Sequence, residues 1–197
     1  MHCTRMNISK DTNMKLNYIP NMLTTLRISL IPLFILAFYY PSKWSYLTTS
    51  LIFSFAALTD WLDGYLARKL GQISHIGAFL DPVADKLIVV VALILLTETH
   101  HSLVISIPTM IIVCREIIIS ALREWMANFN RSKIVAVSFI GKVKTTTQMT
   151  AILLLLFKFP QLEDFTMILG YIFLYISTFL TILSLYKYLK AAFQTIE

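Results

Sequence analysis

The stretch from Trp44 to Thr97 reads WSYLTTSLIFSFAALTDWLDGYLARKLGQISHIGAFLDPVADKLIVVVALILLT and contains two long apolar segments around a polar one. The apolar segments, residues 44–66 and 78–97, are continuous and do not alternate with polar residues. Each approaches or exceeds the length of about 20 residues that a membrane-spanning helix needs. We therefore expect two membrane-spanning helices here, joined as antiparallel neighbours by the short polar segment 67–77.

The rest of the chain has the same apolar character. It contains 197 residues, of which 57% are hydrophobic and only 14% are charged, and its mean hydropathy is +0.70. Soluble domains are nearer to about 45–50% apolar and about 25% charged. The composition therefore excludes both a soluble globular domain and a disordered chain, and it predicts an all-α integral membrane protein.

The apolar runs predict six transmembrane helices with short connections. We expect residues 1–17 to be a polar N-terminal extension, which lacks the apolar core of a signal peptide, and residues 18–197 to form a single six-helix domain. The expected spans are residues 22–40, 44–66, 78–97, 103–122, 143–158 and 165–187.

The basic residues predict the orientation of these helices. If both termini are cytoplasmic, every Lys and Arg except Lys43 and Lys158 lies at an inner helix end or in an inner segment. Cytoplasmic segments of membrane proteins carry this excess of basic residues. The net charge of +6 is then accounted for without any nucleic-acid partner.

Four aspartates lie at the facing inner ends of the second and third expected spans. Asp60 and Asp63 are three residues apart, and Asp81 and Asp85 are four apart, so each pair projects from one helix face. A carboxylate within a span costs about 2.5–3.5 kcal/mol on insertion scales. Four that converge from two neighbouring helices therefore need cations beside them.

Two kinds of cation can meet this need. Hard oxygen ligands favour Mg²⁺ or Mn²⁺, and a pair of such ions is the common arrangement for displacement at phosphorus. The alternative is that the acids pair with Arg68, Lys86 and Arg115 and only hold the helices together.

The segment from Asp60 to Asp85 also carries a recognisable motif. Its skeleton is D-x2-D-G-x2-A-R-x8-G-x3-D-x3-D, and it resembles the signature of the CDP-alcohol phosphotransferase family at every position. The expected six-helix pattern extends the resemblance over nearly the whole chain. The matching residues are Asp60, Asp63, Gly64, Ala67, Arg68, Gly77, Asp81 and Asp85.

The resemblance implies an enzyme that moves a phosphate-bearing group from a CDP-linked donor to an alcohol and releases CMP. It implies two Mg²⁺ or Mn²⁺ ions, with Asp60, Asp63, Asp81 and Asp85 as metal ligands and Asp85 also as the catalytic base. It further implies a homodimer. The residues along the CMP moiety would be Asp60, Gly64, Ala67, Arg68 and Gly77, although Ala67 could serve helix packing alone and Gly77 could be a loop glycine.

A second group of residues concerns the acceptor. Arg115 interrupts an apolar run, and Lys142 and Lys144 lie near the inner end of the fifth expected span. Together they predict a cationic pocket for an acceptor that carries a phosphate. The alternatives are that Arg115 extends its charge to the membrane surface and that the lysines are interfacial. Thr24, Arg27, Glu116, Thr145 and Gln148 are further candidates for supporting roles, although Arg27 could be an orientation anchor and Glu116 could only orient Arg115.

Longer segments are similar to one branch of the family. These segments are Ile19–Arg27, Thr59–Gly64, Gly77–Lys86, Cys114–Trp125 and Ile140–Met149. The branch transfers a phosphatidyl group from CDP-diacylglycerol to sn-glycerol 3-phosphate in phosphatidylglycerol synthesis. The similarity implies a multi-pass protein of the bacterial cytoplasmic (inner) membrane, surrounded by membrane lipid, with its active site facing the cytoplasm.

Three other functions remain open from the sequence. A sibling enzyme would use serine, inositol or phosphatidylglycerol as acceptor. A divalent-cation transporter would also place carboxylates within its spans. A membrane prenyltransferase would use aspartates to hold a metal and a diphosphate, but its aspartates usually lie in two separate motifs.

Overall fold

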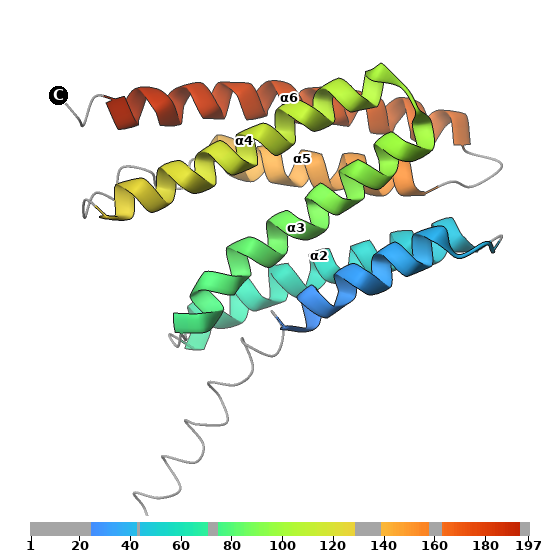
Figure 1. The fold of residues 1–197 in the computed structure, drawn as a ribbon, viewed down its shortest axis with the longest axis horizontal. Coiled ribbons are helices and arrows are strands. Elements are labelled where there is room, and N and C mark those ends of the chain that lie inside the picture. The colour runs from blue at the N-terminus through green and yellow to red at the C-terminus, as the bar shows by residue number, and fades with distance from the viewer. Residues whose placement is uncertain (1–24, 43, 71–74, 129–138, 158–162, 194–197) are drawn as a thin grey trace, which may run out of the picture. The chain divides into compact units, whose positions relative to one another are not determined.

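The computed structural model describes residues 25–42, 44–70, 75–128, 139–157 and 163–193. Within these residues the chain forms helices and no strand, as expected for an all-α protein (Figure 1). Each expected span overlaps one helix of the described residues. The helices are Thr25–Tyr39, α2 (Ser45–Leu70), α3 (His75–His100), α4 (Leu103–Asn128), α5 (Phe139–Leu156) and α6 (Glu163–Phe193).

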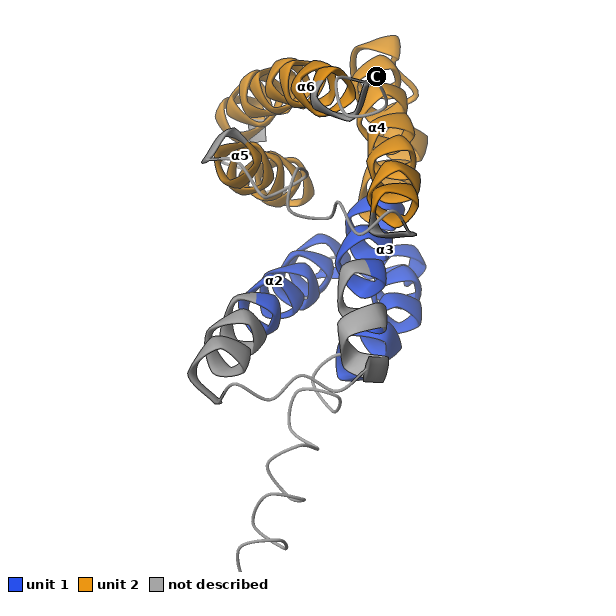
Figure 2. Ribbon diagram, turned by 90° about the vertical axis from the view of Figure 1, so that its left-hand side faces the viewer, with its two compact units in different colours: residues 1–91 blue, residues 92–197 orange. Residues whose placement is uncertain are grey.

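The chain divides into two compact units, which Figure 2 shows in different colours. Unit 1 comprises Met1–Val91 and contains helix Thr25–Tyr39, α2 and the first part of α3. Unit 2 comprises Ala92–Glu197 and contains the rest of α3 with α4, α5 and α6. The expectation of a single domain over residues 18–197 stays a prediction.

In unit 1, a serine closes the hairpin between helix Thr25–Tyr39 and α2. The Ser45 hydroxyl lies 2.8 Å from the carbonyl oxygen of Ala37 and 2.9 Å from that of Phe38. The last carbonyls of a helix have no partner within the helix, so this hydroxyl satisfies groups that would otherwise be costly in an apolar environment. The buried rings of Phe34 and Phe53 pack nearby with 6.1 Å between their centroids.

In unit 2, the turn between α3 and α4 is fixed by two adjacent residues. His101 adopts a left-handed backbone conformation with φ of 42°, and its N–H donates to the Thr97 carbonyl over 3.1 Å. This is a common way for a helix to end. Ser102 then caps α4, because its hydroxyl oxygen accepts a hydrogen bond of 3.2 Å from the Val104 N–H.

Helix α4 contains a proline, and a residue of α6 replaces the hydrogen bond that this proline cannot make. Pro108 has no N–H to donate to the carbonyl of Val104, four residues earlier. The Tyr175 hydroxyl of α6 donates to that carbonyl over 3.2 Å. Apolar surroundings would make an unsatisfied carbonyl expensive, so Tyr175 supplies a donor that the helix itself lacks.

Helix α6 packs against α4 and α5 through small and polar residues. The side chains buried along it include Thr166, Ser177, Thr178, Thr181 and Ser184. Its exposed side chains are large and apolar, and they include Phe165, Ile168, Ile172, Ile176, Phe179 and Ile182. This reverses the pattern of a water-soluble helix and is typical of a helix surrounded by lipid, where small residues allow close contact.

A glycine allows close contact between α5 and α6. A Cβ atom added to Gly170 would lie 2.7 Å from Cγ of Leu155. Any larger residue would therefore require the Leu155 side chain or one of the helices to shift. Close contact of this kind favours association of helices in a membrane.

Two helices of the described residues are long and apolar enough to cross a membrane. They are Leu103–Met126 and Asp164–Lys190, and helix Thr25–Tyr39 is a shorter apolar helix. Together with the apolar exposed face of α6, they indicate a membrane protein. Six spans and cytoplasmic termini stay predictions.

Candidate functional site

A buried arginine brings two of the predicted aspartates together in unit 1. The Nη1 atom of Arg27 lies 3.4 Å from Oδ1 of Asp60 on α2, and it donates a hydrogen bond to Oδ1 of Asp85 on α3. Arg27 is only 1% exposed, whereas the side chains of Asp60 and Asp85 are 45% and 36% exposed. One nitrogen thus contacts carboxylates from two helices, which places those carboxylates at a common point.

This contact gives Arg27 a clear electrostatic role. A buried guanidinium is costly unless charged groups compensate it, and Asp60 and Asp85 supply that compensation. Sequence reasoning named Arg27 only as a supporting residue or an orientation anchor. Its direct contact with both aspartates depends on the packing of three helices.

The remaining motif residues have described backbones but not described side chains. Asp63, Gly64, Ala67 and Arg68 lie on α2, and Gly77 and Asp81 lie on α3. Thr24 lies outside the described residues altogether. Among the side chains that are described, no three from His, Cys, Asp and Glu are grouped to hold a metal ion. The site with four carboxylates therefore stays a prediction that depends on Asp63 and Asp81.

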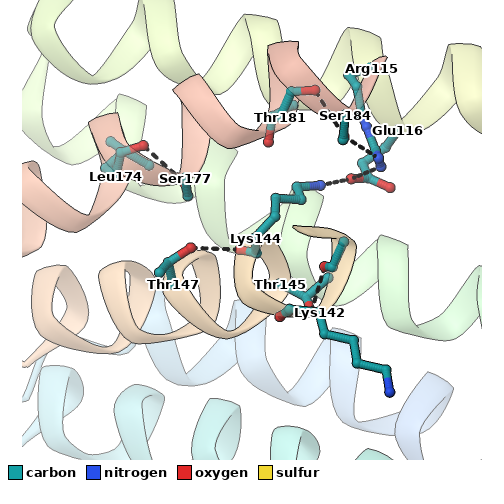
Figure 3. Close-up of polar contacts among 11 residues, drawn as sticks. Arg115, Glu116, Lys142, Lys144, Thr145, Thr147, Leu174, Ser177, Thr181 and Ser184 are labelled. Carbon is teal, nitrogen blue, oxygen red and sulfur yellow. Dashed lines mark hydrogen bonds and ion pairs between the residues drawn. The ribbon is translucent and has the colours of Figure 1, made fainter. Parts of the chain in front are cut away.

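Unit 2 contains a second polar network, built from α4, α5 and α6 (Figure 3). Lys144 of α5 forms an ion pair with Oε1 of Glu116 on α4. The same oxygen accepts a hydrogen bond of 3.1 Å from Nη1 of Arg115, and Nη2 of Arg115 donates to the Ser184 hydroxyl of α6 over 2.7 Å. Two cations therefore meet at one carboxylate oxygen.

Two buried cations of this network contact the same carboxylate. Arg115 is 6% exposed and Lys144 is 1% exposed, so both cations are buried, and Glu116 is the carboxylate that they share. In addition, Nε of Arg115 is buried and has no hydrogen-bond partner among the described residues. A buried guanidinium with an unused donor favours the binding of an anion.

An aromatic side chain of α6 packs against the same arginine. The Tyr188 ring centroid lies 5.8 Å from Cζ of Arg115 and 5.9 Å from Cζ of Arg123. Tyr188 also packs with Ile119 and Met126 in a buried apolar cluster. A guanidinium within about 6 Å of an aromatic ring gains a cation–π attraction.

The other residues predicted for the acceptor site lie differently. Lys142 is exposed, and its side chain points away from Lys144 (Figure 3). Thr145 is also exposed, and its hydroxyl donates to the Lys142 carbonyl of its own helix over 2.9 Å. Gln148 is buried one turn after Lys144 on the same helix. The structure thus brings Arg115, Glu116 and Lys144 together and does not bring Lys142 to them.

Sequence reasoning missed Ser184 and Tyr188. A signal was present, because Ser177, Thr181, Ser184 and Tyr188 recur at helical spacing within an apolar run. That spacing predicts a shared helix face. It does not identify the partner on the neighbouring helix.

Comparison with known proteins identifies the class. The sequence model of the family described as CDP-alcohol phosphatidyltransferase matches residues 17–183. The chain belongs to this family, whose members generally depend on divalent metal ions. The resemblance inferred from the segment Asp60–Asp85 is therefore confirmed.

Curated bacterial relatives share about half of their residues with this chain. A CDP-diacylglycerol–glycerol-3-phosphate 3-phosphatidyltransferase of Pectobacterium atrosepticum is 52% identical over 174 residues, which are 88% of this chain and 94% of the relative. A protein of the same name from Pseudomonas fluorescens is 51% identical over 180 residues, 91% of this chain and 92% of the relative. A third, from Escherichia coli strain K12, is 49% identical over 174 residues, again 88% of this chain and 94% of the relative.

Proposed function

We propose that this protein transfers a phosphatidyl group from CDP-diacylglycerol to sn-glycerol 3-phosphate, giving phosphatidylglycerophosphate and CMP. The observation that carries the proposal is the convergence of Asp60 and Asp85 on one cation. This convergence occurs in a chain that is about half identical to enzymes named for this reaction over most of its length.

The donor would be held by residues of α2 and α3. Asp60, Asp63, Asp81 and Asp85 would hold two Mg²⁺ or Mn²⁺ ions. The contact of Asp60 and Asp85 with Arg27 supports this assignment. Two carboxylates that lie close enough to share one cation are also placed to bind one divalent ion. When bound, the ions would neutralise charge on the diphosphate of the donor.

The CMP moiety would lie along the neighbouring motif residues. Gly64 has no side chain and would leave room for the nucleotide one turn from the metal ligands. Arg68 would contribute positive charge toward the phosphates. Asp60, Ala67 and Gly77 complete the proposed CMP-binding set.

The acceptor phosphate would bind to cations of unit 2. Arg115 and Lys144 are buried together, and their charge exceeds that of the one carboxylate between them. A phosphate dianion would add negative charge beside both cations, whereas inositol is uncharged and the carboxylate of serine is offset by its own ammonium group. Lys142 would assist from the protein surface, and Thr24, Arg27, Glu116, Thr145 and Gln148 would support the two sets of ligands.

Asp85 would act as the base. It takes the proton from the 1-hydroxyl of glycerol 3-phosphate as that oxygen attacks the β-phosphorus of the donor. The bond from this phosphorus to the CMP oxygen breaks, and CMP leaves. A base must reach its proton within hydrogen-bond distance, and partial exposure of the Asp85 carboxylate, at 36%, leaves it accessible to a substrate.

The membrane arrangement follows from the substrates. The acyl chains of CDP-diacylglycerol stay in lipid while its nucleotide reaches water, so an active site at the cytoplasmic edge of the inner membrane suits both. We infer six spans with both termini inside, a single domain over residues 18–197, and a homodimer. The exposed apolar residues of α6 support contact with lipid.

The test is release of CMP by the purified protein in detergent with CDP-diacylglycerol and Mg²⁺ or Mn²⁺. Glycerol 3-phosphate, serine, inositol and phosphatidylglycerol are offered one at a time. We expect release with glycerol 3-phosphate alone and its loss on addition of EDTA. Release with another acceptor would assign a sibling activity, and metal binding without any release would favour the transporter.

A pair of variants tests the base. Asp85→Asn should retain binding of the CDP-lipid and lose turnover, because the amide cannot take the proton. Asp164→Asn is the matched control, since Asp164 is exposed near the start of α6 and belongs to neither ligand set. Turnover by Asp85→Asn close to that of Asp164→Asn would remove Asp85 from the base role.

A further inference from the structure

The hydroxyl of Ser184 has a fixed orientation in the network of unit 2. It donates its proton to the Thr181 carbonyl over 3.0 Å, and it accepts the hydrogen bond of 2.7 Å from Nη2 of Arg115. Ser184 is only 1% exposed, so water does not compete for these bonds. Because its single proton is already used, its lone pairs face the guanidinium.

Arg115 is therefore held by two different helices. On α4, Glu116 contacts Nη1 over 3.1 Å. On α6, Ser184 contacts Nη2, and the Tyr188 ring lies 5.8 Å from Cζ. Contacts at both terminal nitrogens, together with the adjacent aromatic ring, restrict the orientation of the guanidinium as well as its position.

The restricted orientation of Arg115 affects the positive charge that is available to a ligand. Arg115 and Lys144 share one oxygen of Glu116, so each cation receives only part of its compensation from that carboxylate. If Ser184 did not hold Nη2, the guanidinium could turn and engage both oxygens of Glu116 in a bidentate pair. Such a pair is strong and nearly neutral, and Arg115 would then no longer be available to bind an incoming anion.

We propose that Ser184, supported by Tyr188, is a positioning residue that holds Arg115 so that Arg115 and Lys144 together bind the phosphate of the acceptor. This inference rests on the proposed function for the identity of the acceptor. It adds a residue of α6 to a site that the sequence motif places on other helices. Ser184 acts through Arg115 and does not itself need to touch the substrate.

The experiment compares Ser184→Ala with Ser177→Ala. Ser177 is a matched control because it is also buried on α6, and its hydroxyl donates over 2.9 Å to the carbonyl of Leu174, three residues earlier. Both variants thus lose a buried hydroxyl that bonds to its own helix. Only Ser184→Ala also loses the contact with Arg115.

We expect Ser184→Ala to raise the KM for glycerol 3-phosphate by about tenfold to hundredfold, the range for loss of a hydrogen bond to a charged group. The KM for CDP-diacylglycerol should stay near that of the parent protein. Ser184→Thr keeps the hydroxyl and should restore most of the acceptor KM. Ser177→Ala should leave both KM values close to those of the parent.

Two results would overturn the proposal. One is an acceptor KM for Ser184→Ala that is no higher than that of Ser177→Ala. The other is a rise that Ser184→Thr does not reverse, since a mere packing defect would behave in this way. Thermal unfolding of all three variants identifies a general loss of stability.

A different result would show that the proposed function itself is wrong. If the parent protein used an acceptor without a phosphate, no KM for glycerol 3-phosphate could be compared. Binding of inorganic phosphate to the parent and to Ser184→Ala, measured by calorimetry, would then decide the matter. Weaker binding by the variant would support an anion site positioned by Ser184, and equal or absent binding would refute it.

Discussion

Replacement of Glu116 by glutamine should strongly destabilise the protein. Glutamine keeps the size of the side chain but removes the charge that Arg115 and Lys144 share. Both cations would remain buried, at 6% and 1% exposure. Removal of one partner from a buried ion pair leaves an uncompensated charge and is strongly destabilising.

The expected magnitude follows from the burial of the pair. Loss of one partner of a buried pair costs about 3–5 kcal/mol, and the 15% exposure of the Glu116 side chain favours the lower end. In a chain of 197 residues, each kcal/mol lowers Tm by about 2–4 °C. We therefore expect Glu116→Gln to lower Tm by about 6–12 °C.

The assay is thermal unfolding in detergent at one fixed scan rate, because heating of membrane proteins is often irreversible. Glu124→Gln is the matched control, since Glu124 lies two turns further along α4 and is exposed. Its Tm should stay close to that of the parent protein.

A second substitution tests whether Arg115 and Lys144 share the charge of Glu116. Lys144→Met alone leaves Arg115 and Glu116 as a balanced pair, so its cost should be smaller than that of Glu116→Gln. Added to Glu116→Gln, it removes one of the two cations that have lost the Glu116 carboxylate and should recover part of the lost stability. An unchanged Tm for Glu116→Gln, or a double variant whose losses simply add, would refute the shared-charge explanation.

Two further predictions concern other contacts. Arg27→Gln should lower Tm more in EDTA than with saturating Mg²⁺, because a bound divalent ion would replace the missing positive charge beside Asp60 and Asp85; an equal loss in both buffers would contradict a shared site. Tyr175→Phe should cost about 1 kcal/mol in the parent protein, because it removes the donor to the carbonyl that Pro108 leaves free, and much less in a Pro108→Ala background. Equal losses of Tm in the two backgrounds would show that the tyrosine does not compensate for the proline.

The sequence alone determined the fold class and the family. The positions of the helices follow from apolar runs of sufficient length, which are properties of neighbouring residues. The aspartate motif is likewise a local pattern within 26 residues, from Asp60 to Asp85. The similarity to the family depends on such patterns, and it could be recognised before any contact between helices was known.

The charge partners could not be predicted in the same way. Arg27 lies far along the chain from Asp85, and Ser184 lies 69 residues from Arg115, yet each pair is in contact. Lys142 and Lys144 are two residues apart, and the structure directs their side chains differently (Figure 3). Spacing along one helix indicates which residues share a face, but not which neighbour that face meets.

One physical cause explains why the sequence predicts the helices but not the partners of their buried charges. Hydropathy and helix formation depend on the residues of a single segment, so the sequence fixes where the chain forms a helix and what surrounds that helix. The compensation of a buried charge depends on how each helix is rotated against its neighbours. Only the tertiary structure decides that Glu116 serves two cations and that a serine of α6 orients Arg115.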